Sequence, residues 1–376
     1  MRFHWFLPTA SDGRTLTTGI RGTHGPGHDQ DLTDTGSDRH RAPDLRYMTQ
    51  IAQAAEHMGF EAILTPVGTF CEDAWLSCAA LAQDTERLKF LVALRPDAIS
   101  PTLAAQMAAT FQRHSRGRLL LNVVTGGEAA EQARFGDHLD KAQRYTRTAE
   151  WLTVLRGAWS GKPFDFTGSH YNVRGATVFA PPDPQPLLYF GGSSPEAGPV
   201  AARHADTYLT WGEPPGQVSA KLERIRALAA AQGRTVRFGI RFHVVARDTS
   251  AQAWAAAEHL VTGIDRHHVE RVQATLAASQ STGQARMSRL HATYRDSGRI
   301  TDLEIYPNLW AGVGLLRGGA GTALVGSHRE VANRITEYAA LGIDEFILSG
   351  FPHLEEAYQV GEGVLPLLGA GAAACR

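Results

Sequence analysis

Arg241 and His243 are the residues whose types and spacing most directly suggest chemistry in this sequence. They stand two positions apart within the apolar run 236–245, so an extended strand would place both side chains on one face. A cation and an imidazole on a buried face are unfavourable unless an anionic or polar group meets them. We interpret the pair as site residues; a solvated edge strand is the alternative.

A second candidate site follows the short apolar run Leu187–Phe190. Gly191 and Gly192 permit close approach of the backbone, and Ser193-Ser194-Pro195 has the composition of a helix start, with a serine N-cap and a proline at the first helical position. Free amides at a helix N-terminus and two hydroxyls suit a phosphate. The alternative is that Ser194 only caps the helix, but barrel enzymes often bind phosphate after their later strands.

Other polar or reactive side chains also stand at or near the ends of β-rich runs. They are Cys71, Arg95, Thr125 and Trp211. Cys71 has no neighbouring base visible in the sequence, so we expect it to line the site without covalent chemistry.

Eight short β-rich runs organise the chain, and most are followed by a segment of helical periodicity. Such alternation predicts a (β/α)₈ TIM barrel, in which the site is built from loops at the carboxyl ends of the strands. The expected strands are Phe3–Pro8, Glu61–Pro66, Leu88–Leu94, Arg118–Val124, Leu187–Phe190, Asp206–Thr210, Val236–Val245 and Glu345–Ser349.

Two helices have clear boundary signals. The segment Leu45–Met58 has apolar residues at helical spacing and stops at Gly59, because glycine tolerates the left-handed conformation that ends many helices. Ser100 and Pro101 open another helix, which we expect to reach about His114.

The composition is that of an ordinary globular protein of 376 residues, with 43% hydrophobic and 20% charged residues. A net charge of −1 gives no electrostatic reason to expect nucleic acid or an anionic membrane surface. No apolar run approaches the roughly 20 residues that cross a bilayer, and the first residues lack a secretory apolar region. Three cysteines without zinc-type spacing indicate a reducing compartment, so we expect a cytoplasmic protein.

We expect a single domain over residues 1–376, in which about a hundred residues beyond a bare barrel form insertions. Residues 21–43, rich in Gly, His, Asp and Thr, predict a long loop after the first strand. Residues 263–322 form the other mobile or inserted segment, which is helical over Val269–Ala278 and Ala285–Arg295. A lid over the site and a peripheral helical pair in subunit contacts are equally consistent with it.

Some motifs that resemble nucleotide or metal sites fail on inspection. The glycine-rich run 318–322 has no Lys-Ser/Thr ending, and residues 312–317 lack the third glycine of a dinucleotide fingerprint. These glycines and Arg317 instead predict a loop that closes over an anion. No His-Glu-x-x-His helix is present, so a metal site is unsupported.

A set of short motifs extends from the first strand to Leu368. They are Trp5–Thr9, Cys71–Trp75, Ser100–Thr102, Asn122–Gly127, Tyr189–Ser194, Tyr208–Pro215, Gly239–Arg241, Asn308–Gly314 and Arg317–Gly326. Together they resemble the FMNH₂-dependent alkanesulfonate monooxygenases of the bacterial luciferase-like family. Within that resemblance, the Thr-Trp-Gly-Glu-Pro-Pro run and the run that begins at Arg317 are specific to the sulfonate branch.

The resemblance implies a two-component desulfonating monooxygenase. A partner NAD(P)H-dependent FMN reductase would supply reduced FMN, O₂ would be the oxidant, and the products would be sulfite and an aldehyde. It also suggests a homo-oligomer, with a homotetramer expected.

The same resemblance assigns roles to site residues. Those implied to hold the flavin phosphate are Ser193, Ser194 and Tyr145, and those implied near the flavin ring are Asn122 and Thr125. Those implied to surround the sulfonate are Arg241, His243, Trp211 and Arg317, with Cys71 lining the same pocket. A sulfonate stays anionic at neutral pH, so guanidinium groups suit it. His243 could donate or accept a proton near pH 7.

Three departures from the family pattern concern the substrate side. Phe351 stands where the family has a tyrosine in its Gly-Tyr-Pro-His run, Ala10 stands where many members have histidine, and Pro66–Cys71 has lost polarity. They suggest an unusual sulfonate or a sulfone as substrate. The alternatives are an F420-dependent oxidoreductase on the same barrel and a non-catalytic flavin-binding protein.

Overall fold

The computed structural model describes residues 1–16, 40–264, 266–291 and 300–370. Most of the predicted loop over 21–43, the end of the helix predicted over 285–295, and Cys375 lie outside these described residues.

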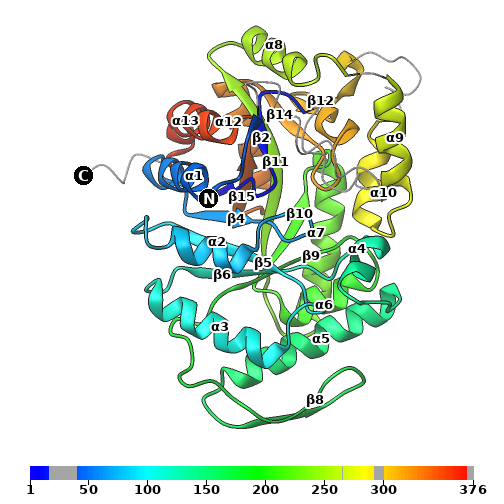
Figure 1. Cartoon of the computed structure of the whole chain (residues 1–376). Helices are drawn as coiled ribbons and strands as arrows, with labels where there is room; N and C mark the ends of the chain where they lie inside the picture. Colours follow the sequence, from blue (N-terminus) through cyan, green and yellow to red (C-terminus); the bar gives the residue numbers. More distant parts are fainter. Residues whose placement is uncertain (17–39, 265, 292–299, 371–376) are drawn as a thin grey trace.

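Eight parallel strands close into a barrel, which confirms the predicted (β/α)₈ fold (Figure 1). Neighbouring strands follow the order β10-β9-β6-β5-β4-β1-β15-β11, and the pairing of β10 with β11 closes the ring. The barrel strands are β1 (Arg2–Phe6), β4 (Ala62–Thr65), β5 (Lys89–Leu94), β6 (Leu119–Val123), β9 (Leu188–Gly191), β10 (Thr207–Trp211), β11 (Arg237–Arg247) and β15 (Glu345–Ser349). Each begins and ends within two residues of a predicted run.

Helices surround the barrel, and most of them cover the outer faces of its strands. They are α1 (Leu45–His57), α2 (Ala74–Leu81), α3 (Pro101–His114), α4 (Ala129–Arg134), α5 (Lys141–Ala158), α6 (Ala197–His204), α7 (Pro215–Ala230), α8 (Ser250–Leu260), α9 (Arg266–Ala277), α10 (Thr282–Arg289), α12 (His328–Ala340) and α13 (His353–Gly363). Short 3₁₀ turns cover Ile300–Leu303, Gly312–Leu315 and Leu365–Leu368.

The predicted boundaries of α1 and α3 are confirmed. Helix α1 stops just before Gly59, whose φ of 85° only glycine adopts readily. Helix α3 begins at Pro101, and the Ser100 hydroxyl accepts the amide of Leu103 at 3.2 Å.

Additional strands lie outside the barrel and have no counterpart in the sequence-based prediction. Strand β14 (Ala323–Ser327) pairs with the outer half of β11, and β13 (Leu309–Trp310) and β12 (Glu304–Tyr306) continue that edge. Two hairpins, β2 (Asp12–Gly13) with β3 (His40–Arg41) and β7 (Phe164–Thr167) with β8 (Asn172–Ala176), are separate; the second projects from the barrel (Figure 1).

The barrel interior is filled by side chains. An apolar cluster occupies its middle, formed by Phe6, Ala62, Leu64, Leu91, Leu120, Tyr189 and Ile347. At the amino ends of the strands, the buried Glu345 carboxylate lies 3.0 Å from His4 Nε2 and accepts a hydrogen bond from the Tyr189 hydroxyl at 2.7 Å. This closed floor leaves the carboxyl ends of the strands as the open face of the barrel.

Candidate functional site at the carboxyl end of the barrel

Arg241 lies at the inner face of β11. Its neighbour Phe242 points outward and packs on Tyr338 of α12, with ring centroids 4.9 Å apart. The guanidinium carbon of Arg241 lies 3.8 Å from the centroid of Phe6, a member of the interior cluster. Arg241 is therefore directed into the mouth of the barrel, above its apolar filling.

His243 is buried one step further along β11, and both of its ring nitrogens have partners. Nε2 lies 3.0 Å from the carbonyl oxygen of Ala320, and Nδ1 lies 2.8 Å from the hydroxyl oxygen of Ser349. Because a carbonyl only accepts, Nε2 carries the proton and the Ser349 hydroxyl donates to Nδ1. Burial, then the charges of Arg241 and Arg317, hold the pKa of His243 well below its usual value, so the imidazole is neutral.

Arg317 reaches the same place from the loop after the 3₁₀ turn Gly312–Leu315. Its guanidinium carbon lies 4.7 Å from the centroid of Phe351, and that ring stacks on His243 at 5.1 Å. Two guanidinium groups, one from strand β11 and one from a loop, thus converge on one buried imidazole, and each lies over an aromatic ring.

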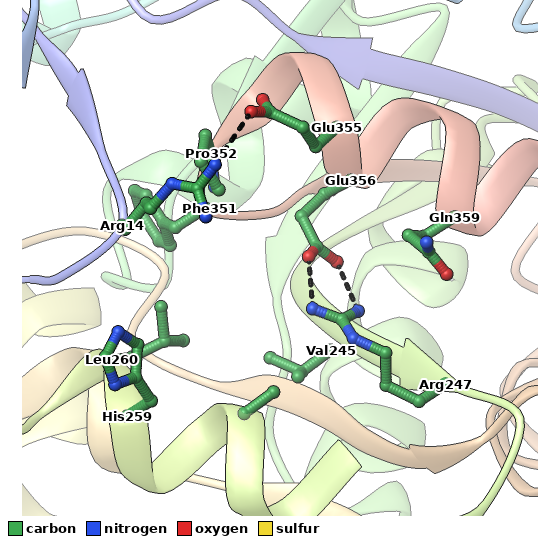
Figure 2. Close-up of a pocket in the computed structure, with 11 residues that line it drawn as sticks. Arg14, Val245, Arg247, His259, Leu260, Phe351, Pro352, Glu355, Glu356 and Gln359 are labelled. Carbon is green, nitrogen blue, oxygen red and sulfur yellow. Dashed lines mark hydrogen bonds and ion pairs between the residues drawn. The ribbon is translucent and has the colours of Figure 1, made fainter. Parts of the chain in front are cut away.

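Phe351 also separates this cluster from a second pocket, shown in Figure 2. There Glu356 pairs with Arg247 through two hydrogen bonds, and Arg14 lies 3.8 Å from Glu355 (Figure 2). Each of these guanidinium groups already has a carboxylate partner.

Trp211 ends β10 and is in register with Arg241 on β11. Its ring edge lies 3.0 Å from the point where a Cβ on Gly283 would stand, so helix α10 packs closely on the indole. The structure places Trp211 between Arg241 and the inserted helices.

Cys71 lies in the loop between β4 and α2, half-buried, with a free thiol. The amide of the next residue, Glu72, donates to the carbonyl of Thr9 at 2.9 Å, which places this loop beside the exit of β1. Arg95, at the exit of β5, pairs instead with Glu131 of α4 at 3.0 Å. Cys71 therefore borders the mouth, whereas the charge of Arg95 is used within the scaffold.

The backbone after β9 forms a narrow cradle. A Cβ on Gly192 would lie 2.6 Å from the Cβ of Ala197 and 3.2 Å from the Tyr145 hydroxyl, so only glycine fits there. The Ser194 hydroxyl accepts the amide of Ala197 at 3.3 Å. Helix α6 begins at Ala197, later than the start predicted at Pro195, because Ser194–Glu196 form a turn before the first helical residue.

The surroundings of this cradle suit a phosphate. The Tyr145 hydroxyl lies against Ser194; burial raises its pKa and the hydrogen bond with Ser194 opposes that rise. Lys141, one turn earlier on α5, lies 3.9 Å from Glu196, and Ser193 is half-exposed. The cradle therefore offers hydroxyls, a lysine and a helix N-terminus together.

Asn122 lies near the end of β6, the strand beside β9, and Thr125 follows that strand. Asn122 is half-buried and alternates with outward-facing Leu121 and Val123, so it faces the barrel interior. Thr125 is buried, and its hydroxyl oxygen lies 3.2 Å from that of Thr148 on α5. The structure thus gives Asn122 access to the mouth and gives the Thr125 hydroxyl a partner within the scaffold.

Helices α9 and α10 pack on each other beside the mouth and contact several of its loops (Figure 1). The Gln284 side chain accepts the amide of Gly319 at 2.9 Å. Across the mouth, Arg144 of α5 donates to Gln280 at 2.8 Å, and Lys141 donates to Thr282 at 3.0 Å. These bonds join the Arg317 loop to the cradle side, as a cover would.

Sequence reasoning missed four residues of this arrangement as site residues: Phe6, Asp12, Ser349 and His353. Phe6 and Ser349 read as ordinary strand residues. His353 opens α13 directly after the exit of β15, and this position was the available signal. Its hydrogen-bond partner Asp12 is 341 positions away, a pairing that only the closed barrel creates.

The described parts of the chain hold no group of three or more His, Cys, Asp or Glu side chains that could bind a metal ion. Among those residues we find no helix both long and apolar enough to span a membrane.

The fold and site define a TIM-barrel protein that brings two arginines together at its mouth and has a narrow glycine-lined cradle two strands away. The chain belongs to the luciferase-like monooxygenase family, whose sequence pattern matches residues 1–345.

Solved structures of low sequence identity share this fold. A riboflavin lyase, solved with modified FMN and riboflavin, is 20% identical over 99% of this chain and 93% of its own, with a TM-score of 0.78. EDTA monooxygenase from Chelativorans sp. BNC1 is 18% identical over 98% and 93%, with a TM-score of 0.74. An F420-dependent secondary alcohol dehydrogenase is 17% identical over 96% and 98%, with a TM-score of 0.66.

Proposed function

We propose that the protein is the oxygenase of a two-component system that uses FMNH₂ and O₂ to convert alkanesulfonates to an aldehyde and sulfite. The observation that carries this proposal is the convergence of Arg241 and Arg317 on buried His243 at the barrel mouth. Two guanidinium groups beside one buried imidazole give this part of the mouth a positive charge, which favours an anionic substrate.

A sulfonate suits a site lined by guanidinium groups better than a carboxylate does. It remains charged throughout the working pH range, and guanidinium groups remain charged with it, so binding does not depend on protonation. The rings of Phe6, Phe351 and Trp211 offer apolar surface for an alkyl chain next to the charged head.

The cradle after β9 fits the phosphate of FMN. Ser193, Ser194 and Tyr145 would hold that phosphate, and the narrow space at Gly192 supports close contact with the backbone. Asn122 and Thr125 would lie near the ring system. The related riboflavin lyase was solved with modified FMN, which supports a flavin over other phosphates. When bound, reduced FMN would supply the electrons that activate O₂.

The protein's own residues would bind the sulfonate and exclude water. Arg241 and Arg317 would hold the head group, Trp211 and Cys71 would line the chain, and His243 would keep the Arg317 loop in place through Ala320. Helices α9 and α10 would limit the access of water to the reacting atoms, which favours productive oxygenation.

We further propose that an NAD(P)H-dependent FMN reductase is the partner, as the resemblance to two-component monooxygenases implies. We also propose a single domain over residues 1–376, a cytoplasmic location and a homotetramer. Size-exclusion chromatography with light scattering would test the homotetramer.

A sulfite-release screen tests the function directly. Purified protein, a flavin reductase, FMN and NADH would be incubated in air with sulfonates of different chain length, for which sulfite is measured, and with dialkyl sulfones, for which the alkanesulfinate product is measured. We expect sulfite from at least one sulfonate and none without O₂. Flavin binding without turnover on any substrate would favour a binding protein. Oxygen-independent redox activity with reduced F420 would favour the alternative suggested by the F420-dependent relative.

A further inference from the structure

His353 is held by Asp12 in one defined orientation. The backbone amide of His353 donates to Asp12 Oδ2 at 2.7 Å, and its ring Nδ1 lies 2.9 Å from Asp12 Oδ1. A carboxylate only accepts, so Nδ1 carries the proton and Nε2 keeps its lone pair when the ring is neutral. The Trp5 indole fixes the backbone further by donating to the His353 carbonyl at 3.1 Å.

Asp12 is itself buried, and further hydrogen bonds hold its carboxylate in place. The Tyr47 hydroxyl donates to Asp12 Oδ2 at 2.7 Å, and Arg41 donates to the Tyr47 oxygen at 3.0 Å. Burial raises the pKa of Asp12, but the interactions with His353 and the Tyr47 bond outweigh it and lower the pKa overall. Asp12 therefore remains a carboxylate that can stabilise a positive charge on His353.

The second nitrogen of this histidine, Nε2, is buried and meets no hydrogen-bond partner among residues 1–16, 40–264, 266–291 and 300–370. The His353 side chain is 1% exposed. An unsatisfied buried polar atom costs about 1–3 kcal/mol, so its presence calls for a ligand or a function.

The position of the ring indicates that function. The ring centroid of His353 lies 5.8 Å from that of Phe6 and 5.0 Å from that of Phe351. These are the two rings on which the guanidinium groups of Arg241 and Arg317 pack. His353 thus stands at the barrel mouth, beside the groups that would hold a sulfonate.

His243 cannot take the same role without loss. Both of its nitrogens are already hydrogen-bonded, and a second proton on Nδ1 would force the Ser349 hydroxyl to turn and accept where it now donates. Of these two histidines, His353 is the one with a nitrogen available for proton transfer.

We propose that His353 is the general base of the reaction and that Asp12 is its positioning residue. The inference rests on the proposed function. Oxygenation of the carbon that bears sulfur gives a 1-hydroxyalkanesulfonate, which must lose its hydroxyl proton. Nε2 accepts that proton, the O–H electron pair forms the C=O bond, and the C–S bond breaks with its pair leaving on sulfur. The step yields an aldehyde, sulfite dianion and imidazolium, so charge and atoms balance.

Charged and titratable groups around His353 determine its response to pH. Asp12 is the carboxylate that contacts the ring, and Arg241 and Arg317 are the cations over the neighbouring Phe6 and Phe351 rings. Three groups of charged or titratable side chains surround His353. The first holds the ring in place (Asp12, Tyr47 and Arg41), the second lies at the barrel mouth (Arg241, His243 and Arg317), and the third follows on α13 (Glu355 and Glu356). Because a general base acts only in its unprotonated form, the proposal expects activity to fall on the acid side of the pH profile.

Three variants test the proposal by sulfite release across pH, with FMN affinity and melting temperature measured for each. For His353→Gln we expect a loss in kcat of about 10²–10⁴-fold, no remaining acid limb in the pH profile, and FMN affinity within about threefold of the wild type. For Asp12→Asn we expect a smaller loss and an acid limb displaced to lower pH.

The matched control is His204→Gln. His204 is also buried with an Nε2 that has no partner in the described part of the chain, but it lies on α6 outside the barrel. We expect wild-type kcat from it. A His353→Gln enzyme that retains more than a third of wild-type kcat with the same acid limb would overturn the proposal.

Nitrogen NMR of ¹⁵N-histidine-labelled protein gives a readout that needs no substrate. We expect a His353 signal, assigned by its loss in His353→Gln, with Nδ1 protonated and Nε2 unprotonated, and a changed tautomer in Asp12→Asn. If the proton of the neutral wild-type His353 ring is found on Nε2, the proposal that His353 is the general base is wrong. If the wild type releases no sulfite, the proposed function and this step both fail, while the NMR result still decides whether Asp12 holds His353 as a base.

Discussion

The guanidinium carbon of Arg317 lies 4.7 Å from the centroid of the Phe351 ring. Phe351 stands where the resembled family has a tyrosine. The contact shows how a ring without a hydroxyl can still position the cation. A cation–π contact of this kind contributes about 0.5–2 kcal/mol.

Phe351→Ala should therefore raise KM for the sulfonate by about 2–30-fold, because Arg317 loses the surface beneath it. Phe351→Tyr keeps the ring and should leave KM within about twofold. Steady-state sulfite release gives both values. Equal KM for the alanine variant and the wild type would show that the ring does not position Arg317.

Arg317→Ala should reduce turnover far more than flavin affinity, because the guanidinium lies at the mouth beside His243, while the phosphate cradle follows β9. Loss of a charge-assisted contact of about 1.5–3 kcal/mol corresponds to about 10–150-fold in kcat/KM. Arg329→Ala, on the exposed side of α12, is the control and should behave as the wild type. Comparable losses of FMN binding and turnover in Arg317→Ala would place this arginine on the cofactor side.

Arg286→Met should loosen α10 from the barrel. Its guanidinium pairs with Glu213, a fully buried carboxylate that Lys221 also contacts at 2.6 Å. A looser cover admits water, so we expect a larger share of the consumed NADH to appear as hydrogen peroxide than in the wild type.

Arg266→Met on the neighbouring helix α9 is the control for that experiment, because Arg266 is largely exposed and pairs only along its own helix. Exposed pairs of this kind contribute little. An unchanged peroxide yield in Arg286→Met would mean that α10 does not exclude water.

The barrel could be predicted from the sequence because its strands are local signals. Each parallel strand is buried on both faces, so it appears as an apolar run, and the spacing of the runs leaves room for helices. The positions of Arg241 and His243 followed from the alternation of side chains along β11.

The supporting contacts could not be predicted, because they join distant residues. Strand β14 is specified by its pairing with the outer half of β11, and nothing local distinguishes it from a loop. The Asp12–His353 pair spans 341 positions and exists only because β1 and β15 are neighbours in the closed barrel. The start of α6 was placed too early because Pro195 fits a turn as well as a first helical turn.

The buried His204 predicts that the free energy of unfolding decreases in acid. Burial, then the charges of nearby arginines, lower its pKa from 6.5 to about 3, so the folded protein binds this proton only in strong acid. The unfolded chain binds it near pH 6.5, so folding stability falls as the pH decreases from about 6.5 toward 3, by at most about 1.4 kcal/mol per pH unit from this group.

His204→Gln should remove that contribution. Urea unfolding of the wild type and the variant at pH 4, 5, 6 and 7 would measure it, and we expect a shallower decline for the variant below pH 6. Parallel declines would show that His204 titrates normally in the folded protein.

The most direct test of the central claim, oxygen transfer to the sulfur-bearing carbon at this mouth, is the isotopic origin of the aldehyde oxygen. The reaction would be run under ¹⁸O₂ with borohydride quenching within seconds, so that the aldehyde is trapped as its alcohol before exchange with water. The account predicts one ¹⁸O atom in the trapped alcohol and one sulfite for each. Sulfite formed with an alcohol oxygen that comes from water, measured in the same way under ¹⁶O₂ in H₂¹⁸O, would contradict it.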